Sequence, residues 1–380
     1  MASRRSSSSL LDKIMHLLNI LAAVSLVLAY LSMYISPEKY WQFAFFGLAY
    51  PFILLGNICF IAFWLIRDPK KMAISLLIII IGYGNIGKHF QFSSKALPKD
   101  TSGFIKVMSY NVKLFDLYNY KKNWTYNYTG RNEIFQYLRQ ETPDIVAFQE
   151  YFYDSKNGFT TRDSIKKILG TNYYHEYFPY VNKNHHYGIA TFSKYPIVQK
   201  GEVVFSNDTH NSAIFSDIKI NKDTVRVYNA HLQSIKLNKE DFLFSASKNK
   251  IKDNVESLGN EFANDSKMIL TKLKLAFVNR AHQAEMIKEH MNNSPYPVIV
   301  CGDFNDSPGS YATRVISKKL KDAFVVSGKG FGKTYNGKMP SFRIDYILHD
   351  KSFISRGFKT DYSIQSSDHF PIYTYLKKKK

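Results

Sequence analysis

Three uncharged, apolar stretches near the N-terminus constrain the fold of this chain more than any other feature. Residues 14–35, 40–66 and 72–87 contain no Asp, Glu, Lys or Arg. A helix needs about 20 apolar residues to cross a bilayer, and the first two stretches satisfy this length. The third ends before Lys88, so it spans only with little tilt or with Lys88 extended to the surface. We predict a membrane anchor over residues 1–90 with about three transmembrane helices.

A cleaved signal peptide is the alternative for the first stretch, because two arginines precede it. A second long apolar stretch follows, however, and no clear small-residue cleavage site is visible, so we favour an anchor. Three basic residues precede the first stretch, namely Arg4, Arg5 and Lys13. Three more lie between the second and third stretches, namely Arg67, Lys70 and Lys71. Cytoplasmic loops carry such an excess of Lys and Arg. Three spans therefore predict an integral membrane protein whose large domain lies on the extracytoplasmic side, whereas two spans would place that domain inside.

Beyond a polar linker over residues 91–103, strand-like and helix-like segments alternate over residues 104–376. Short apolar runs such as 144–148 and 297–301 are typical of buried strands, and apolar residues in 132–140 recur at helical spacing. These segments fit one large α/β domain. Residues 236–291 predict a charged, mostly helical insertion, which we expect to be a surface excursion rather than extra helices near a site. Residues 377–380 predict a solvated basic tail.

Composition excludes several classes of protein. Hydrophobic residues make up 45% of the chain and aromatic residues 16%, which excludes a disordered chain, a collagen and a coiled coil. Only Cys59 and Cys301 are present, which excludes a disulfide scaffold. The formal net charge of +20 suits a polyanionic partner.

Polar side chains stand at the ends of several predicted strands. A polar residue directly after an apolar strand is costly if it is buried without a partner, so several of them suggest one shared polar pocket. Each alone is more often structural, but the set is rich in oxygen, which suits Mg²⁺ or Mn²⁺ and not zinc. The set comprises Asn111, Glu150, His231, Asp303, Asn305, Asp345, Asp368 and His369.

The segments that carry these residues resemble the endonuclease/exonuclease/phosphatase superfamily. Seven segments occur in the family's order, and together they are a specific signal: 109–112, 144–150, 187–197, 229–232, 302–305, 343–347 and 367–371. The resemblance implies an α/β fold, namely a four-layer α/β/β/α sandwich with two mostly antiparallel sheets, here preceded by transmembrane helices. It also implies metal-dependent hydrolysis of a phosphoester with Mg²⁺ or Mn²⁺ as the cofactor.

The resemblance also implies roles for the site residues. Glu150 is the expected principal metal ligand, with Asn111 and Asp368 as further metal contacts. Some branches carry an acidic residue where this chain has Lys113, so no metal contact is expected there.

The remaining residues have implied catalytic roles. Asp303 should orient or deprotonate the attacking water, and Asn305 should position the transferred group. His231 and His369 should donate to phosphate oxygens, and Asp345 should hold His369 in its charged form. Which histidine protonates the leaving oxygen stays open.

Three interpretations of the substrate compete. The net positive charge favours a nuclease that binds nucleic acid. The anchor favours a phosphodiesterase acting on phospholipid head groups, with the aromatic-rich loop 117–128 entering the membrane interface. A non-catalytic membrane scaffold is the remote alternative, because no residue of the motifs is lost. We expect a membrane-anchored Mg²⁺-dependent phosphodiesterase with nuclease-like activity.

Overall fold

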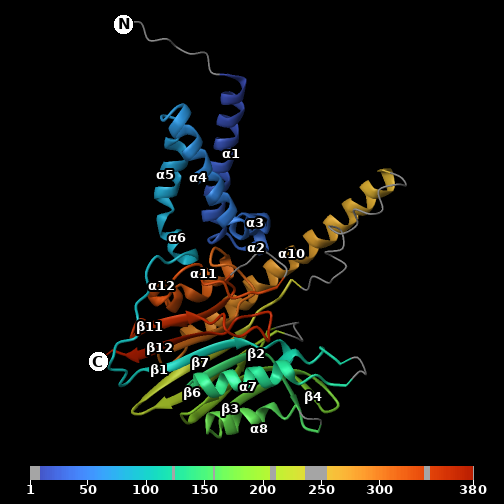
Figure 1. Ribbon diagram of the computed structural model, residues 1–380, viewed down its shortest axis with the longest axis vertical. Helices are drawn as coiled ribbons and strands as arrows, with labels where there is room; N and C mark the ends of the chain where they lie inside the picture. Colours follow the sequence, from blue (N-terminus) through green and yellow to red (C-terminus); the bar gives the residue numbers. More distant parts are fainter. Residues whose placement is uncertain are drawn as a thin grey trace.

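The computed structural model describes residues 9–121, 125–156, 159–205, 211–235, 255–337 and 343–379. The N-terminal helices form an elongated bundle that stands on a large α/β domain (Figure 1). Of the long helix α10 (Val255–Asn292), only the backbone is described before residue 267.

The bundle contains two helices that are long and apolar enough to cross a membrane. These are α1 (Leu10–Ser32) and α4 (Tyr50–Arg67). The short helices α2 (Pro37–Tyr40) and α3 (Gln42–Leu48) join them at the end nearest the α/β domain. The helices α5 (Ala73–Ile81) and α6 (Tyr83–His89) run in tandem beside α4 and lead back to that domain (Figure 1).

Two predicted spans are interrupted. The 40–66 stretch is broken between α3 and α4, where Pro51 occupies the first turn of α4 and cannot continue a preceding helix. The 72–87 stretch is broken at Gly82, against which the Tyr30 ring packs so closely that a Cβ would lie 1.9 Å from it. Uninterrupted helices over 40–66 and 72–87 were therefore wrong, although α5 and α6 together follow the length of α4 (Figure 1).

Polar side chains hold the interior of the bundle together. Ser75 Oγ donates to Asn19 Oδ1 at 2.5 Å and lies 2.8 Å from Asn57 Oδ1, while Asn57 Nδ2 donates to the Ala22 carbonyl at 3.0 Å. These contacts join α1, α4 and α5. Interhelical hydrogen bonds of this kind stabilise helices that lack a hydrophobic driving force between them.

The α/β domain contains two six-stranded sheets. The first has the order β11-β12-β1-β2-β4-β3 and the second β5-β6-β7-β8-β10-β9. Only the β1–β2 and β7–β8 pairs are parallel among the described strands. The strands are β1 (Ile105–Asn111), β2 (Ile145–Asp154), β3 (Tyr173–Asn182), β4 (His185–Ser193), β5 (Ile197–Val203), β6 (Ser212–Ile220), β7 (Asp223–His231), β8 (Val298–Asp303), β9 (Lys321–Asp322), β10 (Asp345–His349), β11 (Phe353–Thr360) and β12 (Ile372–Lys378).

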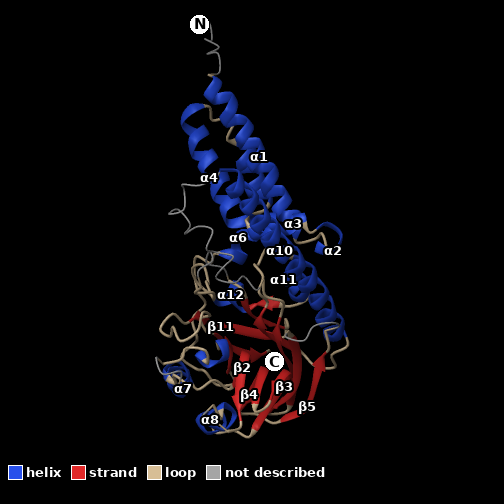
Figure 2. Ribbon diagram, turned by 90° about the vertical axis from the view of Figure 1, so that its right-hand side faces the viewer, coloured by secondary structure: helices blue, strands red, loops and turns tan. Residues whose placement is uncertain are grey.

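Three apolar clusters define four layers. One fills the space between the sheets, a second lies under α7 (Thr129–Glu141) and α8 (Thr161–Leu169), and a third lies under α10 and α11 (Tyr311–Ser317). The helices α7 and α8 lie at the end of the domain away from the bundle (Figures 1 and 2). This arrangement confirms the predicted α/β/β/α sandwich.

Two predictions at the edges of the domain were wrong. Lys377 and Lys378 belong to β12, where Lys377 Nζ donates to the Ser102 carbonyl, so the basic tail is shorter than expected. The loop at 117–128, whose residues 122–124 lie outside the described chain, leads into α7 on the layer away from the bundle. The described residues of this loop therefore do not lie beside the apolar helices (Figure 1).

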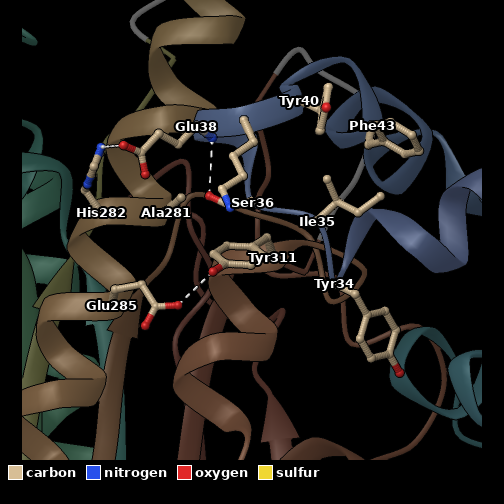
Figure 3. A pocket seen from close by; sticks show the side chains of 11 residues that line it. Tyr34, Ile35, Ser36, Glu38, Tyr40, Phe43, Ala281, His282, Glu285 and Tyr311 are labelled. Carbon is tan, nitrogen blue, oxygen red and sulfur yellow. Dashed lines mark hydrogen bonds and ion pairs between the residues drawn. The ribbon is translucent and has the colours of Figure 1, made fainter.

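The predicted insertion is not a surface excursion over its described part. Ala284 and Ile287 of α10 pack with β8 in the third cluster, and the buried Arg280 Nε donates to Asp306 Oδ2 at 2.9 Å. A cavity of about 750 Å³ separates α2 and α3 from α10 and α11. Figure 3 shows Glu38 and His282 facing each other at this cavity. His282 Nε2 lies 3.8 Å from Glu38 Oε1. Residues 236–254 lie outside the described residues.

Candidate active site

The site forms where the layer between the two sheets turns from apolar to polar. Alternate residues of a strand face the same side, so Ile299, Cys301 and Asp303 share the inner face of β8, and the first two belong to the inter-sheet cluster. On β7, His231 pairs with Asp303 in register, and on β10, Asp345 pairs with it from the other side. The same alternation puts a polar residue at one end of each inner row.

Buried amides join the two sheets directly beneath these residues. Gln149 Nε2 on β2 donates to Asn229 Oδ1 on β7 at 2.7 Å. Asn229 Nδ2 donates to the carbonyls of Phe148 and Ala190 at 3.1 and 3.0 Å. The sequence motifs contain both amides, but only the cross-sheet contact reveals that they fix the distance between the two halves of the site.

A β-bulge aims Glu150 into the site. The register between β2 and β4 shifts between Phe148 and Tyr151, and Glu150 has a φ of +47°. A non-glycine residue with positive φ is strained, and a bulge within a strand re-aims the side chain that it carries. The bulge therefore leaves the Glu150 carboxylate at the mouth of the site, with 36% of the side-chain surface exposed.

Asn111 connects the two carboxylates that face each other across the sheets. Its Nδ2 donates to Glu150 Oε1 at 3.2 Å and to Asp303 Oδ2 at 2.9 Å. Its Oδ1 accepts the Lys113 amide at 3.1 Å. In this arrangement the Asn111 side-chain nitrogen holds Glu150 and Asp303 in place, while its oxygen accepts a hydrogen bond from the backbone.

Asp345 and His369 form a buried pair. His369 Nδ1 lies 2.9 Å from Asp345 Oδ2, and both side chains are almost wholly enclosed. Burial alone would lower the pKa of His369, but the Asp345 and Asp303 carboxylates outweigh it and raise that pKa to about 10. The imidazole is therefore positively charged near neutral pH, with Nε2 directed at Asp303 Oδ2, 3.6 Å away.

Asp303 lies at the centre of the site. Burial raises the pKa of its carboxyl to about 6, and Asp345 adds to this rise while His369 and His231 oppose it. His231 Nε2 lies 3.9 Å from both Asp303 Oδ2 and Glu150 Oε1. A carboxylate with a pKa near neutrality, flanked by two imidazoles, suits proton transfer.

Asn305 and Asp368 lie at the periphery of this group. Asn305 Nδ2 donates to the Leu232 carbonyl at 3.0 Å, so the side chain ties the loops after β7 and β8 together. The backbone N–H of Asn305 also donates to Asp303 Oδ1 at 2.8 Å. Partial removal from water raises the pKa of Glu150, His369 opposes this rise, and the negative charge of nearby Asp368 adds to it.

Thr334 and Tyr335 are site neighbours that sequence reasoning missed. Thr334 Oγ1 accepts the Asp345 amide at 3.1 Å, and the Tyr335 ring lies edge-on to His369 with centroids 5.3 Å apart. Residues 330–337 contain no apolar strand pattern, so the sequence gives no signal that this loop returns to the site.

The side chains fit a divalent cation. Four carboxylates, those of Glu150, Asp303, Asp345 and Asp368, meet two imidazoles. Burial and neighbouring carboxylates raise the pKa values of Glu150 and Asp303 although His369 opposes the rise, and a bound cation would offset this cost. Asp345 Oδ1 is buried with no hydrogen-bond partner among the described residues. Carboxylate oxygens in this number suit Mg²⁺ or Mn²⁺. Asp303, Asp345 and His369 also offer ligand atoms within 4.8 Å of one another.

Comparison with known proteins identifies the family. Residues 108–369 match the model described as the Endonuclease/Exonuclease/phosphatase family. This chain belongs to that family. Members of the endonuclease/exonuclease/phosphatase family are metal-dependent phosphoesterases, so the chain is a metal-dependent hydrolase acting on phosphate esters. Residues 12–89 match a separate domain of unknown function.

Several solved structures are similar to this chain, and the one with a TM-score above 0.5 shares the fold of the α/β domain. An endonuclease/exonuclease/phosphatase from Bacteroides vulgatus is 15% identical, covers 73% of this chain and 99% of its own, and has a TM-score of 0.51. A mannosyl-6-phosphatase from Bacteroides thetaiotaomicron is 19% identical over 72% of this chain and 99% of its own, with a TM-score of 0.47. A truncated Caenorhabditis elegans TDP2 is 15% identical, covers 72% of this chain and 97% of its own, and has a TM-score of 0.45. No curated protein sequence matches the chain.

Proposed function

We propose that the protein is a membrane-anchored, Mg²⁺-dependent phosphodiesterase. The observation that carries this proposal is the convergence of Glu150, Asp303 and the Asp345–His369 pair around one polar site. They come from the bulge of β2, the end of β8, the start of β10 and the loop before β12. Such convergence of buried charge is expensive unless it serves a ligand.

Each residue has a role that its contacts support. Asp303 accepts a proton from the attacking water, because its pKa of about 6 leaves it ionised yet basic at neutral pH. His369, held charged by Asp345, donates to a phosphoryl oxygen. His231 donates from the opposite side, 3.9 Å from Asp303. Asn305 keeps the loop after β8 in position for the transferred group.

The metal would be held chiefly by Glu150, with Asp368 beside it. Asn111 would support this site by orienting Glu150 through its amide, and would reach the metal only by releasing the Lys113 amide. The bound cation supplies polarisation of a phosphoryl oxygen and neutralises developing charge.

Anchoring in a membrane is supported by the arrangement of the bundle. The ends of α1 and α4 far from the α/β domain are joined by the Asp12–Arg67 ion pair at 2.8 Å. The link from α4 to α5, which contains Lys70 and Lys71, lies at the same end of the bundle (Figure 1). With α5 and α6 as a third crossing, these basic residues face the cytoplasm and the active site lies on the extracytoplasmic side.

The substrate we favour is the phosphodiester backbone of a nucleic acid, because a net charge of +20 attracts polyanions. A phospholipid head group is the second candidate, favoured by the bundle that holds the domain against a membrane. Plasmid nicking, compared with head-group release from phosphatidylcholine liposomes, distinguishes the two.

Hydrolysis of bis(p-nitrophenyl) phosphate by the full chain tests the catalytic proposal. Activity should require Mg²⁺ and be abolished by EDTA. Glu150→Gln and Asp303→Asn should each lower kcat at least about a hundredfold. Asp163→Asn, an exposed carboxylate on α8 far from the site, is the matched control and should keep wild-type activity. Near-normal turnover by either site variant would refute the proposed roles.

A further inference from the structure

A groove of about 950 Å³ lies at the junction of the bundle and the α/β domain, and the proposed catalysis does not use it. One wall comes from α4 and the end of α6, and the other from Pro308 and the loop at 329–333. Among the described residues that line it, none is acidic.

The wall on α4 is apolar and continuous with the surface that faces lipid. Phe52, Leu55 and Ile58 lie on one side of the helix at a spacing of three residues, and they are 57%, 58% and 48% exposed. Phe331 stands on the opposite wall, is 73% exposed, and contacts Phe90 with ring centroids 4.8 Å apart. An acyl chain that follows α4 out of the bilayer would therefore enter between two apolar surfaces.

The other end of the groove is basic. Lys329 and Lys333 line it, and so does the buried Arg343. Arg343 Nη2 forms an ion pair with Asp322 Oδ2 and donates a hydrogen bond to the Lys88 carbonyl, both at 2.8 Å. Its Nε and Nη1, however, are buried without a hydrogen-bond partner among the described residues.

Two further buried polar groups at this end lack a partner in the part of the chain that is described. They are Tyr50 Oη and His89 Nε2, on rings whose centroids lie 4.5 Å apart. His89 Nδ1 lies 3.1 Å from the Asn85 carbonyl, which only accepts, so Nδ1 carries the proton and Nε2 is an acceptor. Buried polar groups are normally paired, so this group of donors and one acceptor indicates a missing ligand.

We propose that the groove binds one anionic phospholipid of the bilayer with a hydroxyl-bearing head group. The phosphate accepts from Arg343 and attracts Lys329 and Lys333, the head-group hydroxyl donates to His89, and one acyl chain lies along Phe52, Leu55 and Ile58. Lys and Arg side chains attract an anionic head group, and the apolar wall packs against an acyl chain. The inference rests on the membrane anchoring proposed above, but not on the nature of the substrate.

Native mass spectrometry of the full chain tests the inference, with phosphatidylglycerol and phosphatidylcholine as probes. We expect one retained phosphatidylglycerol per chain and at least a tenfold preference over phosphatidylcholine. Lys329→Glu with Lys333→Glu should abolish the preference, and Leu55→Trp should lower retention of both lipids by filling the apolar wall. The control Lys222→Glu with Lys351→Glu changes the same charge at exposed sites outside the groove and should bind as wild type.

Several results would overturn the inference. Equal retention of the two lipids, retention unchanged by the groove variants, or a lipid-free dimer whose second copy fills the groove would each do so. Photo-cross-linking in phosphatidylcholine nanodiscs with diazirine-labelled phosphatidylglycerol separates this failure from failure of the anchor. A chain that enters nanodiscs but is labelled evenly along α1 and α4 refutes the groove alone. A chain that does not enter nanodiscs refutes the proposed anchoring. Labelling concentrated at residues 52–58 and 331 supports both.

Discussion

The bundle and the α/β domain place their polar groups in opposite ways. In the bundle, Asn19, Asn57 and Ser75 are buried while large apolar side chains such as Leu17 and Ile80 remain 58% and 62% exposed. In the α/β domain, apolar side chains fill the space between the sheets and polar groups gather at one end of it. The exposed apolar surface of the bundle suits a surrounding without water, whereas the α/β domain encloses its apolar side chains and suits water.

The same contrast holds for charge. The Asp12–Arg67 ion pair of the bundle lies at the bundle's far end and is partly exposed. The α/β domain has exposed pairs as well, but it also buries charges, either in closed pairs such as Arg280–Asp306 or in the open group around Asp303. Removing one partner of a closed pair leaves a buried charge uncompensated, whereas the open group has the proposed catalytic role. Substitutions in the two should therefore affect different measurements.

The largest effect on stability is expected at the closed pair. Arg280→Met leaves the buried Asp306 carboxylate without its guanidinium and should lower the free energy of unfolding of the α/β domain by about 3–5 kcal/mol. Urea unfolding of the full chain in detergent measures this. Lys288→Met on the same helix breaks an exposed pair with Glu285 and should cost at most about 1 kcal/mol.

A second variant makes this prediction independent of helix packing. Arg280→Met combined with Asp306→Asn removes both charges and should recover much of the lost stability, because the unpaired carboxylate is the main cost. If the double variant were as unstable as Arg280→Met alone, the loss would come from packing of α10 and not from charge.

The next effect concerns the open group. His369→Asn and Asp345→Asn should each lower kcat/KM about a hundredfold, which corresponds to about 2.7 kcal/mol in the activation free energy. Because the two residues act as a unit, the double variant should be little worse than the more damaged single variant. Effects that multiply would show that His369 works without Asp345, and steady-state kinetics on bis(p-nitrophenyl) phosphate decide between these outcomes.

The pH dependence of His369 gives a smaller and more specific signal. Its pKa of about 10 in the fold lies above the ordinary value of about 6.5. The protonated form is therefore favoured by folding, and its contribution to stability is complete below pH 6.5 and disappears as pH rises through about 10. In metal-free protein, imidazole NMR should show the Asp345→Asn variant titrating closer to the ordinary value. An unchanged titration would mean that Asp345 is not the main cause.

The sequence predicted the site better than it predicted what surrounds it. Glu150 and Asp303 each follow a run of buried strand residues, and Asp303 does end β8. The expectation that Glu150 ends its strand was wrong, because β2 continues beyond the bulge to Asp154. The bulge that turns Glu150 inward depends on the register between β2 and β4, which no local pattern contains. The pairing of Arg280 with Asp306 is likewise invisible, since it joins a helix to a loop 26 positions away.

The anchor shows the opposite limitation. Its apolar stretches were evident from the absence of charge, yet the break at Gly82, beside Tyr30 of another helix, carries no charge to mark it. Hydropathy identifies which residues avoid water, but it does not identify where a helix is interrupted.

The smallest predicted effect compares one amide in each region. Asn229→Leu removes the donor to the Phe148 and Ala190 carbonyls and the acceptor for Gln149, all buried, and should cost about 1–3 kcal/mol in the free energy of unfolding. Asn57→Leu removes the contacts to Ser75 and to the Ala22 carbonyl. In a membrane the Asn57 side chain also finds hydrogen-bond partners in the unfolded state, so the cost should be about 0.6 kcal/mol. Urea unfolding of the full chain in detergent measures the first and reversible unfolding in mixed micelles the second. Equal costs would mean that the bundle interior is solvated like the α/β domain, which would contradict a membrane environment for α1, α4 and α5.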